Sequence, residues 1–176
     1  MMSTRTINTS KAAPMSDNPF THLDDSGDAR MVNVGAKSVT QRQATASVVC
    51  HMLASTAQAI RQDQIAKGNV LQVARLAAIG AAKRTDELIP LCHGLPLDGV
   101  DVSFSWASEI QLRIEVSVAA TAKTGVEMEA MVAASIAALT VYDMCKAVDR
   151  SMVIADLQLE RKSGGSRGEF IRNTES

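Results

Sequence analysis

Aromatic side chains are scarce in this sequence: its 176 residues include one Trp, one Tyr and three Phe. This scarcity argues against an aromatic platform on which nucleic-acid bases could stack. Charge of one sign is also missing, because 18 Lys and Arg stand against 19 Asp and Glu. Interspersed charges of both signs provide no basic surface for a nucleic acid. We therefore expect no nucleic-acid partner.

Long apolar runs and paired cysteines are also lacking. No apolar run reaches about 18 residues without a polar interruption, and the N-terminus has no apolar signal-peptide segment, so we expect no membrane association. The three cysteines form no CxxC pair, and they fit reduced thiols better than a disulfide framework. The sequence therefore predicts a cytoplasmic protein with one domain, long enough to bury a proper core.

The chain divides into three segments by composition. Residues 1–20 are polar and lack periodicity, which predicts a disordered N-terminal tail. Residues 21–170 form the expected domain, and residues 171–176 a short C-terminal tail.

Alternation of apolar and polar residues predicts four strands. The first lies within residues 41–52, two more at 100–106 and 110–118 form a hairpin, and the last lies at 152–161. In the first strand, one side is expected to be apolar (Ala44, Ala46, Val48, Cys50 and Met52) and the other polar (Thr45, Ser47 and His51).

The segments between these strands have apolar residues at helical spacing. Ser55 is a candidate N-cap for a short helix, and Asn69 for a second helix that continues to about residue 85. Thr124 and Glu127 have the spacing of a capping box at the start of a long third helix. The order predicts an α+β fold, a ferredoxin-like βαββαβ sandwich in which helices pack on one face of an antiparallel sheet.

The long helix carries an acid and a base near its end, Asp143 and Lys146, on one face of an otherwise apolar segment. They are either a weak surface ion pair or a partly buried acid/base pair in a cleft. Glu129 lies fourteen residues before Asp143, a separation of about 21 Å along a helix. If both residues serve one small substrate, one of them must come from a second subunit.

Two loops are further candidates for a binding site. In LCHGLPL, Cys92 and His93 have no ligand pairs at zinc spacing, so we expect no metal; His93 either contacts substrate or faces solvent. In KSGGSRG, glycine backbone with Lys162 and Arg167 suits a phosphate, although a solvated C-terminal segment has the same composition. Lys67, next to Gly68 at a helix start, leaves the same two interpretations open.

Six segments occur in the order found in a known family: THLDDSGDARMV, KGNV, AAKRTDELIPLCH, KTGVEMEAM, ALTVYDMCKAV and KSGGSRGEF. They span nearly all of residues 21–170, and KTGVEMEA and YDMCKAV are the most specific of them. On these segments the sequence resembles the cyclic pyranopterin monophosphate synthases, the C proteins of molybdenum cofactor (molybdopterin) biosynthesis.

The resemblance implies a ferredoxin-like subunit in a homohexamer, a trimer of dimers, with active sites at the subunit interfaces. It implies a phosphorus–oxygen lyase that converts 3′,8-cyclo-7,8-dihydro-GTP into cyclic pyranopterin monophosphate and pyrophosphate. An upstream radical SAM enzyme would supply this nucleotide. The resemblance implies no cofactor.

The resemblance also assigns roles to individual residues. The implied catalytic residues are the acid/base pair Asp143 and Lys146, together with Lys67. The implied substrate-binding residues are Leu91, Cys92, His93, Glu127, Met128, Glu129 and, near the triphosphate, Lys162. These types suit the reaction, because a triphosphate needs cations and the ring rearrangement needs proton transfers.

The sequence departs from the family pattern at two positions. Asn33 stands where the family has Asp, and an amide cannot carry charge or act as a base. Gly94 follows His93 where many members have Pro, which should loosen that loop. Two other classes stay open: a noncatalytic nucleotide-binding oligomeric module, in which Asp143 and Lys146 lock an interface, and a metal-dependent hydrolase.

Overall fold

The computed structural model describes residues 27–165 and 168–173. The chain divides after Val32, and the strands and helices named below all belong to the unit that starts at Asn33. The N-terminal tail predicted for residues 1–20 lies outside the described residues. Of the segment predicted as a C-terminal tail, Ile171 is the second residue of a short strand.

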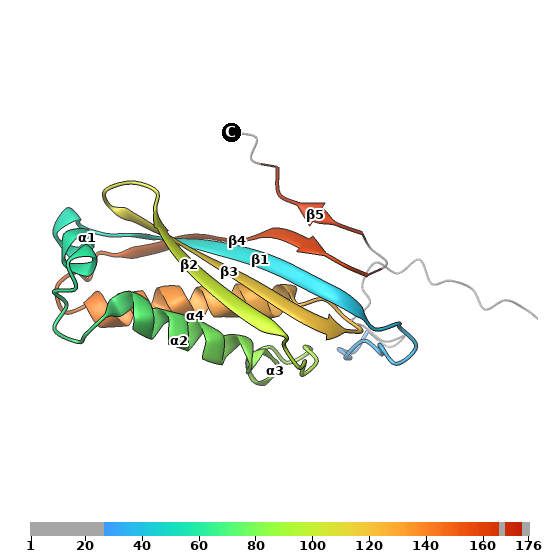
Figure 1. Ribbon diagram of the computed structural model, residues 1–176. Helices are drawn as coiled ribbons and strands as arrows, with labels where there is room; N and C mark the ends of the chain where they lie inside the picture. The colour runs from blue at the N-terminus through green and yellow to red at the C-terminus, as the bar shows by residue number, and fades with distance from the viewer. Residues whose placement is uncertain (1–26, 166–167, 174–176) are drawn as a thin grey trace, which may run out of the picture. The chain divides into compact units, whose positions relative to one another are not determined.

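One antiparallel sheet forms the framework of this unit (Figure 1). Its strands lie in the order β2-β3-β1-β4-β5. Their bounds are Thr40–His51 for β1, Gly99–Trp106 for β2, Gln111–Ala122 for β3, Val153–Ser163 for β4 and Phe170–Ile171 for β5. The first four strands have the order of a ferredoxin-like sheet, and the predicted hairpin is β2 and β3.

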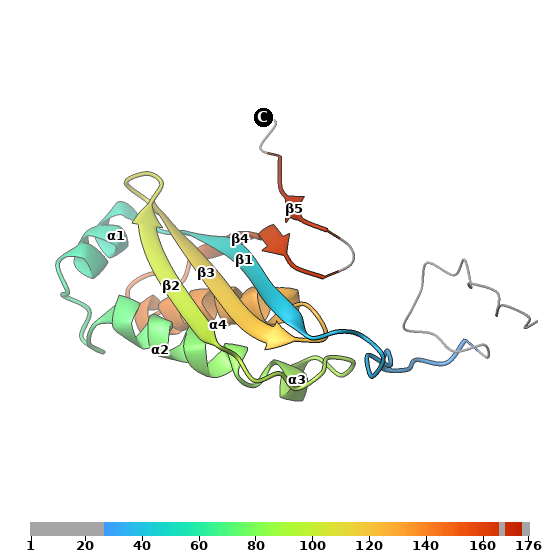
Figure 2. The same cartoon turned by 45° about the vertical axis from the view of Figure 1, so that its right-hand side comes forward.

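Four helices accompany the sheet: α1 (Ala54–Arg61), α2 (Val70–Ala82), α3 (Thr85–Leu88) and α4 (Glu127–Cys145). Figures 1 and 2 show α2 and α4 side by side on one face of the sheet. The C-terminal end of α4 lies toward α1, and its N-terminal end lies toward α3. The predicted α+β ferredoxin-like fold is confirmed, with α3 and β5 as additions.

The core lies between the sheet and the helices. The predicted apolar side of β1, from Ala44 to Met52, is buried, and Val48 pairs with the buried Ile114 of β3. The buried side of α4, which packs against α2 and the sheet, carries small residues that let backbones approach closely (Ala130, Ala133, Ala134, Ala137 and Ala138). By length and composition α4 could cross a membrane, but 56% of it is buried, as in a core helix.

Two of the three predicted helix starts are wrong. Asn69 does cap α2, because its side-chain oxygen accepts a hydrogen bond from the Gln72 N–H at 2.9 Å. Ser55, however, lies inside α1, whose N-cap is Leu53. The Leu53 N–H instead donates to a carboxylate oxygen of Asp149, 2.8 Å away and 96 residues later in the chain, so a tertiary contact satisfies this helix end.

The capping box predicted at the start of α4 does not form. The N-cap is Val126, without a side-chain hydrogen bond, and Glu127 is the first helical residue. The Glu127 carboxylate lies 2.7 Å from Nζ of Lys162 on β4. The Glu127 carboxylate therefore forms an ion pair with β4 and not the capping-box hydrogen bond to the backbone.

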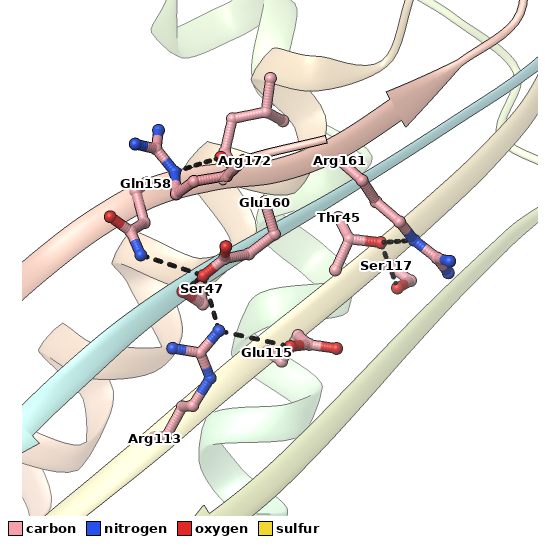
Figure 3. A network of polar contacts seen from close by, with 10 residues as sticks. Thr45, Ser47, Arg113, Glu115, Ser117, Gln158, Glu160, Arg161 and Arg172 are labelled. Carbon is pink, nitrogen blue, oxygen red and sulfur yellow. Dashed lines mark hydrogen bonds and ion pairs between the residues drawn. The ribbon is translucent and has the colours of Figure 1, made fainter. Parts of the chain in front are cut away.

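The face of the sheet opposite the helices holds a network of polar contacts (Figure 3). Thr45 and Ser47 were predicted to face away from the core, yet both are buried. The Ser47 hydroxyl donates to the Glu160 carboxylate at 2.5 Å, and Arg113 donates to the same oxygen at 2.6 Å. Long charged side chains from β3 and β4 thus cover the hydroxyls of β1 and connect three strands.

Replacing Glu160 tests the contribution of this network. Glu160→Gln should lower the free energy of unfolding by about 1–3 kcal/mol, because it leaves the half-buried Arg113 with only its longer ion pair to Glu115, at 3.5 Å. Burial acts to raise the pKa of Glu160, but hydrogen bonds from Ser47, Arg113 and Gln158 outweigh it, so the pKa is lowered. This stabilisation is present above the unfolded-state pKa and is lost as pH falls through the folded-state pKa.

Urea unfolding near neutral pH and in acid provides the measurement. The parent should lose more stability on acidification than Glu160→Gln, because the variant has no carboxylate to protonate. Equal acid dependence of the two proteins would show that the ion pair contributes nothing to stability.

Candidate functional site

Three charged side chains predicted to be catalytic meet at the C-terminal end of α4. Asp143 lies in the last turn of the helix, and Lys146 is its C-cap. Nζ of Lys146 is 2.6 Å from one carboxylate oxygen of Asp143. Nζ of Lys67 is 3.1 Å from the other oxygen and 2.7 Å from the Asp143 backbone carbonyl. The structure thus joins Lys67 to a pair that is 76 residues away in sequence.

Local structure explains how Lys67 reaches the helix end. It lies in the loop between α1 and α2, where Gly68 takes a φ of +103° and the chain turns into the Asn69 cap. The carbonyls at a helix C-terminus lack partners within the helix and carry partial negative charge. The Lys67 ammonium, which binds a last-turn carbonyl and the Asp143 carboxylate, therefore interacts favourably with this helix end.

The electrostatics of this cluster favour charged forms. Hydrogen bonds from Lys146 and then Lys67 lower the pKa of Asp143, and the hydrogen bond with Asp143 raises the pKa of Lys146. Near neutral pH, Asp143 is an anion and Lys146 a protonated cation, able to donate a proton. The side chains are about half exposed, 57% for Asp143 and 51% for Lys146, so one chain alone does not enclose them in a cleft.

A second set of predicted residues gathers at the N-terminal end of α4. Glu127 pairs with Lys162, and both side chains are about 30% exposed. Met128, the next residue of the helix, is exposed. Glu129 is almost fully buried, at 4% exposure. This end of the helix therefore combines an ion pair, an exposed thioether and a buried carboxyl group.

Burial makes Glu129 an unusual carboxyl group. Desolvation raises its pKa from the ordinary 4.5, and the negative charges of Glu127 and Asp86 raise it further. Desolvation likewise raises the pKa of Cys92, with Glu129 and Asp86 adding to the shift. The predicted Leu91–His93 segment follows α3 and is half-buried. Cys92, Asp86 and Glu129 therefore form one local group.

Asp86 and Arg42 are candidate site residues that the sequence analysis missed. Asp86 lies on α3, and nothing in its spacing links it to Glu129, 43 residues later. Arg42 on β1 donates to the backbone carbonyls of Ala122 and Lys123 at 3.3 Å. Its guanidinium occupies the space where a side chain at Gly165 would lie. Both contacts are tertiary, so no local pattern predicts them.

The glycine-rich turn after β4 needs its glycines for steric reasons. Gly164 has a φ of +91°, and a Cβ there would collide with the Gln41 carbonyl. Gly165 has a φ of +80° and packs against Arg42. The turn therefore brings Arg42 and the end of β4, with Lys162, to one corner of the unit. Arg167 lies outside the described residues.

The two departures from the family pattern have simple structural consequences. Asn33 Oδ1 accepts a hydrogen bond from the Gly35 N–H at 2.8 Å, which an aspartate could also accept. At Gly94, a Cβ would lie 2.7 Å from a carboxylate oxygen of Asp86. Glycine at position 94 thus lets the Asp86 side chain approach the backbone closely. Asn33 keeps the hydrogen bond to the Gly35 N–H.

The two clusters do not meet within one chain. Glu127 and Asp143 are sixteen residues apart on one continuous helix, which corresponds to about 24 Å along its axis. Figures 1 and 2 show the two ends of α4 at opposite ends of the helical layer. Among residues 27–165 and 168–173, no three or more His, Cys, Asp and Glu side chains are grouped to hold a metal ion.

Replacing Glu129 tests its burial directly. Glu129→Gln should raise the midpoint of thermal unfolding near pH 8, because the fold disfavours the ionised carboxylate. The raised pKa means that the parent loses stability as pH rises through it. Near pH 4 the carboxyl group is largely neutral in both the folded and the unfolded state. The parent and the variant should then have the same midpoint of thermal unfolding. A variant less stable than the parent at both pH values would contradict this interpretation.

Comparison with known proteins gives one consistent result. The profile of the MoaC family matches residues 31–165. A cyclic pyranopterin monophosphate synthase of Heliobacterium modesticaldum is 53% identical over 156 residues, covering 88% of this chain and 98% of the relative. One of Rhodopirellula baltica is 49% identical over 164 residues, covering 88% and 94%.

A third relative, cyclic pyranopterin monophosphate synthase 3 of Mycobacterium tuberculosis, is 52% identical over 157 residues, or 89% of each chain. The matched region includes both ends of α4 and the loops that carry Lys67 and Cys92. The chain belongs to the MoaC family.

Proposed function

We propose that this chain is a lyase of molybdenum cofactor biosynthesis. It converts 3′,8-cyclo-7,8-dihydro-GTP into cyclic pyranopterin monophosphate and releases pyrophosphate. The observation that carries the proposal is the Lys67–Asp143–Lys146 cluster, in a chain about 50% identical to synthases of that name. A noncatalytic nucleotide-binding module would not need two ammonium groups on one carboxylate.

The cluster at the C-terminal end of α4 supplies the proton transfers. Asp143 is ionised and holds the two ammonium groups of Lys67 and Lys146 at 3.1 and 2.6 Å. Each ammonium can donate a proton to a ring nitrogen or a leaving oxygen, and can stabilise negative charge that develops there.

The cluster at the N-terminal end of α4 binds the nucleotide. The Lys162 and Arg42 side chains bind the triphosphate beside the glycine turn. Lys162 then leaves its ion pair with Glu127 and pairs with a phosphate group. The Leu91–His93 segment and Met128 border the purine-derived ring. Glu129 contributes a hydrogen-bonding carboxyl group to the ring, one whose pKa is raised by burial.

A second copy of the chain completes each site, within a homohexamer of three dimers. One chain keeps its two clusters about 24 Å apart, which is longer than a small nucleotide can bridge while reacting at both. The acidic end of α4, where Glu127 and Glu129 lie near Asp86 of α3, complements the cationic end of a partner's α4, where Lys146 lies near Lys67. Exposed apolar residues, among them Met128 and Leu139, lie along α4 between the two ends.

We also place the reaction in the cytoplasm, directly after the radical SAM enzyme that makes the cyclised nucleotide. Cys50 and Cys145 are free buried thiols, as a reducing compartment would keep them. Incubation with the cyclised nucleotide tests the proposal: the chain should form pyrophosphate and the cyclic pyranopterin together, and nucleotide binding without product would disprove it.

A further inference from the structure

Asp149 is a buried carboxylate that the proposed chemistry does not use. It lies in the turn after α4 and is 2% exposed. One oxygen accepts the Leu53 N–H at 2.8 Å, and the other accepts the Ser151 hydroxyl and N–H at 2.7 and 3.0 Å. Burial acts to raise its pKa, but these bonds and one from Thr56 outweigh it, so the pKa is lowered and Asp149 is ionised.

This carboxylate acts at the start of α1 as the third-residue side chain of a capping box would, because it accepts the backbone N–H of the N-cap residue, Leu53. The N-cap residue of that helix, Leu53, has no side chain able to bind the free N–H groups. Asp149 supplies both the acceptor and the negative charge that a helix N-terminus favours. The start of α1 is therefore fixed to the turn that immediately follows Lys146.

The other end of α1 leads to Lys67. The turn after the helix is held by the Gln64 N–H, which donates to the Ala59 carbonyl at 2.8 Å. The Gly68 N–H then donates to the Ile65 carbonyl at 2.9 Å. These short-range bonds make α1 and the Lys67 loop one local unit, so a displacement of the helix start is transmitted to Lys67.

A pocket of about 300 Å³ separates this unit from the end of α4. Its lining is mainly apolar and comes from both sides: Ser55, Thr56, Ala59, Gln64, Ile65, Ala66 and Lys67 from the unit, and Met144, Ala147 and Val148 from α4 and its turn. Where a pocket replaces packed atoms, fewer van der Waals contacts fix the spacing of the two walls. Ala57, Ile60 and Ile65 still pack α1 and its loop into the core, and polar attachments fix the spacing of the walls at the pocket itself.

Two such attachments flank the pocket. On one side Asp149 holds Leu53 and Thr56, and on the other Lys67 holds Asp143. Substrate must compete with Asp143 for the Lys67 ammonium during the reaction, so this second attachment is not permanent. The Asp149 attachment is then the one that keeps the Lys67 loop at its distance from Asp143 and Lys146.

We propose that Asp149 is a positioning residue, which acts through α1 to keep the Lys67 ammonium within hydrogen-bonding distance of Asp143, beside Lys146. This inference rests on the proposed function, because it assigns Asp149 to the same site. Asp149 is buried away from the reacting groups and does not touch substrate.

Asp149→Asn tests the inference, because the amide keeps the size of the side chain but loses one acceptor and the charge. Its kcat should fall about 10–100-fold, as expected for misplacing a catalytic group by about 1 Å. KM should change less than about threefold, because the binding residues lie at the other end of α4. Amide hydrogen exchange in residues 53–67 should be at least about tenfold faster than in the parent.

Glu160→Gln is the matched control. It also removes a hydrogen-bonded carboxylate, one that is partly buried (17% exposed) and lies on the opposite face of the sheet. It should lower stability while leaving kcat and the exchange of residues 53–67 as in the parent. Ser151→Ala, which removes one donor and keeps the Leu53 bond, should fall between the parent and Asp149→Asn in both readouts.

Three outcomes would overturn the inference. Asp149→Asn could lower stability as Glu160→Gln does and leave kcat unchanged. It could raise KM rather than lower kcat, or leave the exchange of residues 53–67 unaltered. If Asp149→Asn does not fold, an unchanged kcat and exchange in Ser151→Ala would also overturn it. An inactive parent would instead disprove the proposed function, and the exchange comparison would still show whether Asp149 holds the Lys67 loop.

Discussion

Asp143→Asn is expected to lower kcat for pyrophosphate release by about 10³-fold, within the range for losing a positioned acid/base group. The amide keeps the shape of the side chain but gives up the charge that holds Lys67 and Lys146. Lys67→Ala and Lys146→Ala should each show losses of similar size, and the three effects should not add, because the groups act as one unit.

The matched control is Asp101→Asn, which makes the same change at an exposed residue of β2. It should leave kcat unchanged. Every variant must keep the oligomeric size of the parent in sedimentation experiments. If Asp143 and Lys146 only stabilise an interface, an apolar pair of similar volume should preserve assembly and activity. That result would disprove the catalytic role.

Two inactive variants should restore activity when they assemble together. We expect Asp143→Asn and Glu129→Ala, which removes the whole hydrogen-bonding group, each to be nearly inactive alone. In hexamers co-expressed at equal amounts, a site takes its cationic end from one chain and its acidic end from another. Random assembly then makes about a quarter of all sites free of either change. Activity should rise from near zero to about a quarter of the parental value.

The control is a mixture of two variants at the same end of α4, Asp143→Asn and Lys146→Ala. Whichever chain supplies that end, each site then carries one defect, so activity should stay near zero. The same result for the Asp143 and Glu129 mixture, at proven subunit mixing, would show that each chain contains a complete site. It would also remove the proposal that a second copy is required.

The fold could be predicted from the sequence wherever local periodicity reflects burial. The alternation from Ala44 to Met52 identified β1, and the apolar run after Glu129 identified α4 as a core helix. Asn69 was predicted as a cap because its own side chain makes the bond. Each of these depends on residues that are neighbours in the chain.

The errors have the opposite origin. The start of α1 is satisfied by Asp149, and the carboxylate expected to cap α4 binds Lys162 instead. Thr45 does lie on the polar side of β1, as predicted, but its burial was not foreseen, because β4 brings Arg161 over it. A sequence pattern does not contain contacts between residues 35, 96 or 116 positions apart, so these features required the structure.

The candidate site divides in the same way. Spacing alone paired Asp143 with Lys146, but only the family resemblance connected Lys67 to them. Spacing also showed that Glu129 and Asp143 lie too far apart to share a small substrate within one chain. Spacing indicated neither Arg42 nor Asp86, because their partners are distant in sequence. Asp86 does lie within the quoted segment AAKRTDELIPLCH, but the resemblance assigned it no role.

The most direct test of the proposed function is a single-turnover reaction of the parent chain with purified 3′,8-cyclo-7,8-dihydro-GTP, with and without Asp143→Asn. We expect the parent to release about one pyrophosphate for each cyclic pyranopterin monophosphate formed, and Asp143→Asn to bind the nucleotide without forming either product. Equal product formation by both proteins would contradict the catalytic role of the cluster. No product from the parent would contradict the proposed function, and the same reaction with Asn33→Asp would show whether the missing aspartate is the cause.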